Sequence, residues 1–388
     1  MKVFFAGTHR DRMPAQTLAA ITPLLPDYGI TRLADVTGLD VLGIPVVMSV
    51  RPLAATLSVS QGKGATLELA RISAAMEAVE LWHAENAVPA PTAALHQVAA
   101  DELPLPYAVT DLEQHAGSLL TARTPLDWIT GRRLTDGAEV LIPLQAVRMG
   151  RRIHDRWRVD CLTASSNGLA SGNTRSEALV HALYEVIERD ATSALGDQPA
   201  RERTYIDPAT VTEPYCAALI ERITAAGAWL ELVQAPSSFG VPAFAAYLWH
   251  EDAAAAMVVG SGAHSDPAVA LSRAITEAAQ SRLTFIAGSR DDIVTSTYLP
   301  ADGFTRPTTP APGADWSALT APLHTRFDTS EAEAAHLAAL LTRHTGTAPM
   351  AVDLAGRDEF AVVKVLCPHL SFRARHEIPR PLPEAVHS

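Results

Sequence analysis

Residues 167–191 read Asn-Gly-Leu-Ala-Ser-Gly-Asn-Thr-Arg-Ser-Glu-Ala-Leu-Val-His-Ala-Leu-Tyr-Glu-Val-Ile-Glu-Arg-Asp-Ala. The glycine-rich start predicts a turn, and the remainder has the apolar spacing of a long helix. Three acids, Glu177, Glu185 and Glu188, are separated by eight and three residues, so they lie on one side of this helix. Surface acids are usually paired with a Lys or Arg about four residues on, but here only Arg189 follows closely. The pattern therefore predicts a helix that holds cations at the edge of a core.

Two other segments of the chain repeat this pattern. In two places a glycine turn is followed, thirteen and sixteen residues on, by a Glu-x-x-Glu pair. The pairs are Glu77 and Glu80 after Gly64, and Glu185 and Glu188 after Gly172. A third, looser copy has Glu277 and Gln280 at the same spacing, followed by Arg282. We therefore expect a mixed α/β fold in which three strand–glycine turn–helix units converge on one site.

The paired acids indicate a site for hard cations. A single Glu-x-x-Glu on a helix is usually a solvated face, but two copies in register after matching turns favour a shared site. Four carboxylates on facing helices suit cations that prefer oxygen ligands. Di-iron sites use Glu-x-x-His, and the last position here is Glu twice and Gln once, which argues against iron. Magnesium bound together with phosphates fits better, because Mg²⁺ shares its coordination sphere with nucleotide oxygens.

Residues 61–64, Gln-Gly-Lys-Gly, offer a phosphate-binding turn but are not a P-loop. A Walker motif needs a glycine five residues before its Gly-Lys and a Ser or Thr after it, where Leu57 and Gly64 stand. The glycines still let backbone N–H groups approach phosphates, and Lys63 adds a positive charge. Four histidines are expected to pack or to lie on the surface rather than to act as ligands or bases: His9, His83, His181 and His264.

The composition excludes several classes of protein. The 388 residues are 48% hydrophobic and carry a formal net charge of −12, which allows a large core and argues against nucleic-acid binding. No apolar run is long enough to span a membrane or to form a signal peptide. The cysteines Cys161, Cys216 and Cys367 are too far apart for a zinc site or a disulfide framework. We therefore expect a cytoplasmic protein.

The chain reads as one catalytic domain over residues 1–388. Strands are expected at 46–50, 54–60, 230–233, 243–249, 349–354 and 360–366. Helices are expected after Gly64 as far as about Glu85, and at 214–226, 267–287 and 330–344. Prolines and glycines predict a flexible loop at about 299–318, and Pro379, Pro381 and Pro383 predict an extended tail over 379–388.

Several of these segments together resemble the YcaO family. The matching stretches are residues 58–64, 73–80, 167–191 and 277–282, with residues 7–10 and Thr17 near the N-terminus. The likeness runs from residue 7 to the last strands and so covers essentially the whole chain. It implies an ATP- and Mg²⁺-dependent enzyme that activates backbone amides of a ribosomally made precursor peptide. In that reaction a nucleophile adds to the carbonyl carbon, ATP phosphorylates the amide oxygen, and phosphate leaves with that oxygen.

The resemblance also implies roles for individual residues. A first nucleotide and magnesium motif is matched by Ser73, Glu77 and Glu80. A second is matched by Asn173, Glu177, Glu185, Glu188 and Arg189. Phosphate-contacting or third-motif positions are matched by Arg10, Thr17, Gln280 and Arg282. The five glutamates are the expected Mg²⁺ ligands, while Lys63 and the arginines would neutralise phosphate oxygens. Catalysis is expected to rest on positioning and charge, centred on Glu77, Glu80, Glu185, Glu188 and Arg189.

The product depends on the nucleophile, which the resemblance leaves open. A Cys, Ser or Thr side chain gives an azoline, sulfide gives a thioamide, and the peptide's own amine gives an amidine. The Pro-x-Pro-x-Pro tail favours azoline formation slightly, although five residues follow it. Residues 29–46 instead resemble members that form thioamides with a TfuA-type partner or act alone in macrocyclic peptide pathways.

The expected partners follow from the same likeness. We expect a homodimer that binds its precursor peptide directly or through a separate delivery or TfuA-type protein, with no nucleic-acid or membrane partner. A rival interpretation is a non-catalytic accessory protein that holds nucleotide or peptide while a partner does the chemistry. The presence of every acid argues against a degenerate site, because a pseudoenzyme need not keep them.

Overall fold

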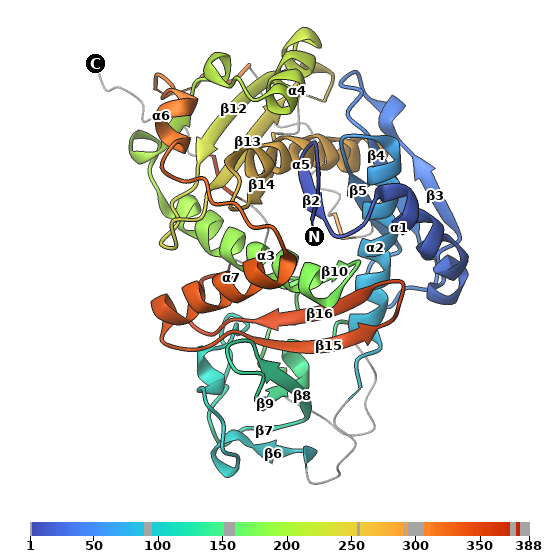
Figure 1. Ribbon diagram of the computed structural model, residues 1–388, viewed down its shortest axis with the longest axis vertical. Coiled ribbons are helices and arrows are strands. Elements are labelled where there is room, and N and C mark those ends of the chain that lie inside the picture. Colours follow the sequence, from blue (N-terminus) through green and yellow to red (C-terminus); the bar gives the residue numbers. More distant parts are fainter. Residues whose placement is uncertain are drawn as a thin grey trace.

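The computed structural model describes residues 2–88, 95–150, 160–253, 257–290, 292–293, 306–309, 311–372 and 378–380. Its larger sheets have three, five and four strands, all antiparallel, and the long helices pack against them (Figure 1). Two short strand pairs are also present. They are β1 (Val3–Phe5) with β2 (Thr8–Arg10), and β6 (Val98–Ala99) with β7 (Pro125–Leu126).

The three- and four-stranded sheets follow the order of the chain, whereas the five-stranded sheet joins strands that are distant in the chain. The three-stranded sheet has the order β3 (Arg32–Asp35), β4 (Val46–Val50), β5 (Val59–Lys63). The five-stranded sheet has the order β10 (Leu169–Gly172), β16 (Ala361–Leu366), β15 (Met350–Gly356), β8 (Trp128–Arg133), β9 (Glu139–Pro143). The four-stranded sheet has the order β11 (Thr204–Ile206), β12 (Trp229–Gln234), β13 (Ala243–Trp249), β14 (Val258–Ala263).

Three long helices follow one strand of each larger sheet. They are α2 (Leu67–Glu85) after β5, α3 (Arg175–Asp197) after β10, and α5 (Pro267–Ala287) after β14. The expected three strand–turn–helix units are therefore confirmed, with each unit on a different sheet. Each of these helices has an N-cap residue whose side chain accepts a hydrogen bond from a backbone N–H of the first turn. The N-cap residues are Thr66 for α2, Thr174 for α3 and Asp266 for α5.

Glycine is needed where strand and helix meet. A Cβ atom on Gly172 would overlap the backbone nitrogen of Ala178, and one on Gly62 would overlap that of Ala74. Because these residues have no side chain, α2 and α3 pack directly on the strands that precede them. The helix positions that follow are thereby fixed relative to the sheets.

The remaining helices cover the sheets and close the core. They are α1 (Pro14–Ile21), α4 (Pro214–Ala225), α6 (Trp316–Thr320) and α7 (Ser330–Thr345). Leu183, Val186 and Ile187 of α3 are buried in a cluster that also contains Val363 of β16 and Leu337 of α7. This apolar side of α3 matches the stripe that the sequence predicts, and it turns the acids of the helix away from the core.

Most expected elements are confirmed to within two or three residues. The strand expected at 54–60 is wrong, because the strand in this region begins only at Val59. The preceding loop is tied to the end of α2: Glu85 accepts hydrogen bonds from the backbone and hydroxyl of Thr56, and its Oε2 lies 2.5 Å from Nη2 of Arg51. These polar contacts hold the segment away from the ladder.

Two expected flexible segments are only partly described. Within the loop expected at 299–318, residues 299–305 and 310 lie outside the described residues. The part at 311–318 is anchored at two points, since Trp316 is buried and Ala314 forms a β-bridge with Ile206. Of the tail expected at 379–388, residues 381–388 lie outside the described residues. In the described part of the chain, no helix combines the length and apolar character that crossing a membrane requires.

Candidate functional site

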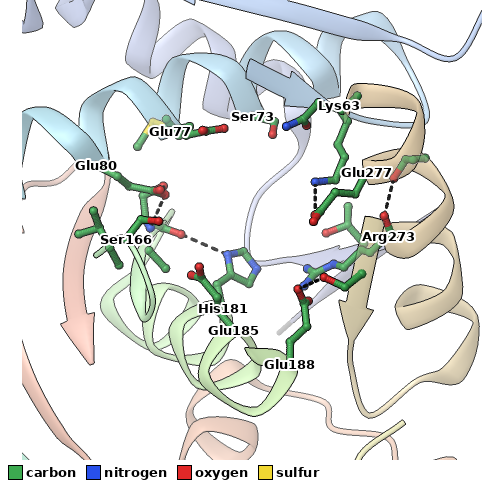
Figure 2. A pocket seen from close by; sticks show the side chains of 18 of the residues that line it. Lys63, Ser73, Glu77, Glu80, Ser166, His181, Glu185, Glu188, Arg273 and Glu277 are labelled. Carbon is green, nitrogen blue, oxygen red and sulfur yellow. Dashed lines mark hydrogen bonds and ion pairs between the residues drawn. The ribbon is translucent and has the colours of Figure 1, made fainter. Parts of the chain in front are cut away.

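A cavity of about 920 Å³ lies where the three units meet (Figure 2). Residues from three equivalent positions on each of α2, α3 and α5 line this cavity. The positions lie nine, thirteen and sixteen residues after the aligned turn positions, which are residues 64, 172 and 264. They hold Ser73, Glu77 and Glu80 on α2, His181, Glu185 and Glu188 on α3, and Arg273, Glu277 and Gln280 on α5. Offsets of four and three residues keep these side chains on one helix face. The internal repeat therefore builds the cavity wall.

The acids on α2 and α3 are short of positive charge. Burial raises the pKa of Glu77 to about 7 and that of Glu185 to about 7. Burial, together with the charges of Glu77 and Glu185, raises the pKa of Glu80 to about 8. Glu80 nevertheless accepts two hydrogen bonds on Oε1, from the backbone (2.7 Å) and hydroxyl (2.6 Å) of Ser171. Such a group of carboxyls favours a bound cation.

Glu188 connects the second unit to the third. Its Oε1 accepts a hydrogen bond from Ser261 Oγ at 2.6 Å, and its Oε2 accepts one from Ala263 N at 3.2 Å. Arg189 lies beside it, with Nη1 3.3 Å from Glu188 Oε1 and Nη2 3.7 Å from Glu185 Oε1. The acids and the arginine expected on this helix are thus brought together in one wall of the cavity.

The N-terminal hairpin brings Arg10 into the same cavity. Arg10 Nη1 lies 3.3 Å from Glu177 Oε1 and 2.5 Å from His181 Nε2. Glu177 also accepts hydrogen bonds from Asn173 Nδ2 (3.0 Å), and Thr17 Oγ1 donates to Asn173 Oδ1 (2.6 Å). The hairpin is anchored from the other side by a buried ion pair between its Lys2 and Glu333 of α7.

Glu177 has different surroundings from the other expected Mg²⁺ ligands. Its side chain is 3% exposed, and both of its oxygens accept hydrogen bonds, from Arg10, from Asn173 and from the backbone N–H of Asp11. These are the surroundings of a residue that orients Arg10 and Asn173. A direct metal contact would require one of these bonds to break.

The first and third units are joined by an ion pair across the cavity. Lys63, at the end of β5, places Nζ 2.9 Å from Glu277 Oε2 (Figure 2). Ser73 and Gln280 line the cavity near these two residues, as the repeat would place them. Lys63 therefore has a carboxylate partner within the site and is positioned by it.

Arg282 does not line the cavity, although the resemblance to the YcaO family implies a nucleotide-binding role for it. Its buried guanidinium pairs with Asp252 (Nη2 to Oδ1, 2.6 Å) and lies 3.4 Å from Asp40 Oδ2 through Nε. Two residues beyond Gln280 correspond to about 200° of helical rotation, which turns Arg282 to the opposite face of α5. In this structure it ties α5 to the loop around Asp40.

Of the nine repeat positions that line the cavity, three are missing from the expected site: His181, Arg273 and Glu277. His181 was expected to pack or to lie on the surface, but its place four residues after Glu177 and four before Glu185 already put it on the acidic face. Glu277 occupies the first acid position of the third unit, a signal that the repeat contains. The packing expected of His83 and His264 is confirmed, since His83 contacts the rings of Tyr28 and Trp82 and His264 is 2% exposed.

A metal ion would need ligands besides the protein here. Within the described residues, no three His, Cys, Asp or Glu side chains are grouped closely enough to hold an ion by themselves. The donor set nevertheless suits Mg²⁺ in a complex with phosphates, since several carboxyls face one cavity and the rest of the coordination sphere stays open. The residues present therefore fit a metal–nucleotide complex better than a metal ion alone.

The fold and cavity define a class: a mixed α/β protein with three helical units around a cavity lined by carboxylates and arginines. The chain belongs to the YcaO family, because the sequence profile described as "YcaO cyclodehydratase, ATP- and Mg2+-binding" matches residues 61–371. Members of this family are in general ATP-dependent enzymes that act on peptides.

Two curated relatives match most of this chain. An uncharacterised protein of Mycobacterium tuberculosis is 39% identical over 98% of this chain and 86% of its own length. A protein described as lying in the tfuA 3′ region of Rhizobium leguminosarum bv. trifolii is 43% identical over 74% of this chain and 69% of its own length.

Solved structures share the fold. A YcaO protein of Methanopyrus kandleri, bound with AMPPCP and Mg²⁺, superposes with a TM-score of 0.67 at 24% identity, covering 95% of this chain and 94% of that one. A heterocyclase in complex with substrate and cofactor gives a TM-score of 0.70 at 21% identity. The match covers 96% of this chain but only 55% of the heterocyclase chain.

Proposed function

We propose that this protein uses ATP and Mg²⁺ to activate a backbone amide in a ribosomally made precursor peptide. The observation that carries the proposal is the division of charge in the cavity. Glu77, Glu80 and Glu185 face it with raised pKa values, while Arg10 and Arg273 bring positive charge to it. A magnesium–triphosphate complex would supply the cation that the acids lack and the anionic oxygens that the arginines can bind. The relative solved with AMPPCP and Mg²⁺ supports this reading.

The acidic and basic residues of the cavity would have different roles. Glu77, Glu80, Glu185 and Glu188 would hold Mg²⁺, and Arg189, with Lys63, would neutralise phosphate oxygens. Glu177 and Asn173 would orient Arg10 toward the same oxygens. ATP, when bound, supplies the phosphoryl group that makes the amide oxygen a good leaving group. The protein's contribution is to hold the reacting groups together and to balance their charges.

For the nucleophile, we expect sulfide, giving a thioamide with a TfuA-type partner. Two observations favour this outcome. The relative from the tfuA 3′ region is 43% identical to this chain, and residues 29–46 resemble members that work with such a partner. The product would then be formed by sulfide attack on the amide carbon and loss of phosphate carrying the former amide oxygen.

Azoline formation is the second candidate, and the C-terminal segment supports it. Ile378 lines the cavity. The carbonyl of Pro379 accepts a hydrogen bond from Arg203 Nη2 (2.8 Å), and Arg380 pairs with Glu231 (3.0 Å). The start of the proline-containing tail is therefore fixed beside the site, as a role in ring formation would require.

Mass spectrometry of a co-expressed precursor peptide distinguishes these products. Exchange of one oxygen for sulfur indicates a thioamide, and loss of one water indicates an azoline or an amidine. Omission of the TfuA-type protein should abolish the sulfur exchange. An unmodified peptide in the presence of all partners would contradict the proposed reaction.

The rival from another class is a non-catalytic accessory protein. It predicts nucleotide binding without peptide-dependent ATP hydrolysis. A Glu188→Ala variant distinguishes the enzyme from the accessory protein. If the protein is an enzyme, this substitution should abolish peptide-dependent ATP hydrolysis while the fold persists. Hydrolysis that is absent in the wild-type protein with every candidate peptide would favour the accessory role.

A further inference from the structure

The N-terminal hairpin of β1 and β2 forms part of the cavity wall without belonging to the hydrophobic core. Its residues that line the cavity are Ala6, Gly7, Thr8 and Arg10. In the part of the chain that the structure describes, none of the hairpin's apolar side chains is a member of a hydrophobic cluster. A two-stranded hairpin is at best marginally stable by itself. The position of this hairpin, and with it that of Arg10, therefore depends on polar contacts at its ends.

Lys2 attaches the first strand of the hairpin to α7 and to the segment that precedes α7. Its side chain is buried, and its Nζ forms an ion pair with Oε2 of Glu333. Its backbone N–H donates a hydrogen bond to the carbonyl of Asp328 (3.0 Å). The next residue, Val3, is paired with Arg10 across the two strands. The attachment at Lys2 therefore lies beside the backbone of Arg10.

Asp11 attaches the second strand of the hairpin. Its Oδ1 accepts a hydrogen bond from Oγ of Ser330 in the first turn of α7 (2.7 Å), and its Oδ2 accepts one from Oγ1 of Thr174 (2.5 Å). Its backbone N–H donates to Oε2 of Glu177 (2.8 Å). Both ends of the hairpin are thus fixed to the first turn of α7, one on each side of Arg10.

Glu333 of α7 is the carboxylate at which the hairpin, α3 and the start of α5 meet. Its side chain is 0% exposed, and its Oε1 accepts hydrogen bonds from Tyr184 Oη (2.5 Å) and Ser265 Oγ (3.1 Å). Among the described Lys and Arg side chains, only Lys2 pairs with it. His264 lies 4.0 Å away but is neutral, because burial lowers its pKa. Since a buried carboxylate needs a compensating cation, the charge of Glu333 holds Lys2 at this junction.

We propose that Glu333 is a positioning residue for Arg10 and acts through Lys2 and the N-terminal hairpin. Glu333 does not line the cavity, so it would not contact the ligand. The inference rests on the proposed function, in which Arg10 meets the phosphate oxygens of the nucleotide. It adds a requirement for α7, a helix outside the three strand–turn–helix units, in completing the nucleotide site.

A double-mutant cycle on the full-length protein tests whether Lys2 acts through Arg10. Calorimetry measures the binding of AMPPCP with Mg²⁺ by Lys2→Met, Arg10→Met, the double variant and Lys2→Arg. We expect Lys2→Met to weaken binding by about tenfold, because Arg10 is then no longer held toward its charged ligand. Lys2→Arg should recover most of this loss. In the Arg10→Met background, Lys2→Met should have little further effect, since the effects of coupled residues do not add.

The cycle separates a positioning role from a structural one. Wild-type affinity in Lys2→Met would overturn the proposal, and so would an equal loss of affinity with and without Arg10. Wild-type affinity in Arg10→Met would overturn it as well, because Arg10 would then need no positioning. If the wild-type protein does not bind AMPPCP with Mg²⁺, the proposed function fails instead, so the two failures are distinguishable.

Glu333→Gln tests the other half of the ion pair, and Glu331→Gln is its matched control, an exposed acid of the same helix. Glu333→Gln should weaken AMPPCP binding as Lys2→Met does and should speed amide hydrogen exchange at residues 3–10, with exchange in α3 unchanged. Glu331→Gln should change neither quantity. Faster exchange throughout α3 would assign Glu333 to the fold as a whole and contradict the proposal. If Glu333→Gln does not fold, the Lys2 variants decide.

Discussion

Glu80 shows at the residue scale how a side chain can be held in place for a ligand at a cost to the fold. Ser171 fixes its Oε1 with two hydrogen bonds. Burial and the charges of Glu77 and Glu185 nevertheless raise its pKa to about 8. Ionised Glu80 therefore destabilises the empty protein, and a cation bound beside it would remove the penalty.

A Glu80→Gln variant should separate stability from binding. The amide keeps the size of the side chain and removes the charge, so the Tm of the ligand-free protein at about pH 8 should stay constant or rise. Binding of AMPPCP with Mg²⁺ should fall by about tenfold or more, because a charged metal ligand is lost. Differential scanning fluorimetry and calorimetry measure the two effects. Glu221→Gln, an exposed acid of α4, is the control, and unaltered binding by Glu80→Gln would remove this residue from the metal site.

Arg282 should behave in the opposite way. Its removal leaves the Asp40 carboxyl, 1% exposed, without its cation, and a broken buried ion pair costs about 3–5 kcal/mol. Arg282→Met should therefore lower the free energy of unfolding by about that amount, as urea denaturation measures. The variant that remains folded should bind AMPPCP much as the wild type does. If Arg282→Met has the stability of the wild type but does not bind AMPPCP, Arg282 belongs to the nucleotide site after all.

At the element scale, the three strand–turn–helix units are the feature that the sequence predicts best. The glycine turn, the capping residue and the Glu-x-x-Glu spacing are local signals, so they fix each unit and the cavity-facing side of its helix. The sequence does not predict that β5, β10 and β14 belong to three different sheets. That arrangement depends on strand pairs between distant segments, such as β10 with β16, for which the local pattern carries no information.

Gly172 should be essential to the second unit. A side chain there would meet the backbone of Ala178, so Gly172→Ala should push α3 away from β10 and lower stability by about 1–3 kcal/mol. The same displacement moves Glu185 and Glu188, so binding of AMPPCP should weaken. Gly38→Ala is the matched control, since a Cβ at Gly38 meets nothing within 4 Å. Equal stability of the two variants, measured by urea denaturation, would contradict the close contact.

At the scale of the whole molecule, the sequence predicts the kinds of residue in the site better than the place of each residue in it. The acids, Lys63, Arg189 and Arg10 all reach one cavity. Arg282 does not, because a likeness in sequence does not show which face of α5 is turned inward. Arg273 and His181 were not predicted, although their spacing from the aligned turn positions is the same as that of Ser73. The homodimer remains a prediction.

The collected acids should make stability depend on pH. Glu77, Glu80 and Glu185 have raised pKa values in the folded protein, about 7, 8 and 7, so the folded state binds their protons more tightly than the unfolded chain does. Their contribution to the free energy of unfolding is present below about pH 4.5 and is lost as the pH rises to about 8.

AMPPCP with Mg²⁺ should offset this loss, because the complex binds the ionised carboxylates. The rise in Tm caused by the complex should therefore be larger at about pH 8.5 than at about pH 5.5. Thermal unfolding at both values, with and without the complex, measures it. An equal rise at the two values would mean that these acids do not meet the cation.

If the three units form one magnesium–nucleotide site, nucleotide binding must depend on both the metal and the acids, and a calorimetric titration measures this dependence. The full-length protein is titrated with AMPPCP in the presence of Mg²⁺ and again with the metal removed by a chelator, alongside a Glu77→Ala variant of confirmed fold. We expect saturable binding by the wild type that disappears without Mg²⁺ and is lost in the variant. Binding of equal strength with and without Mg²⁺, or in Glu77→Ala, would contradict it.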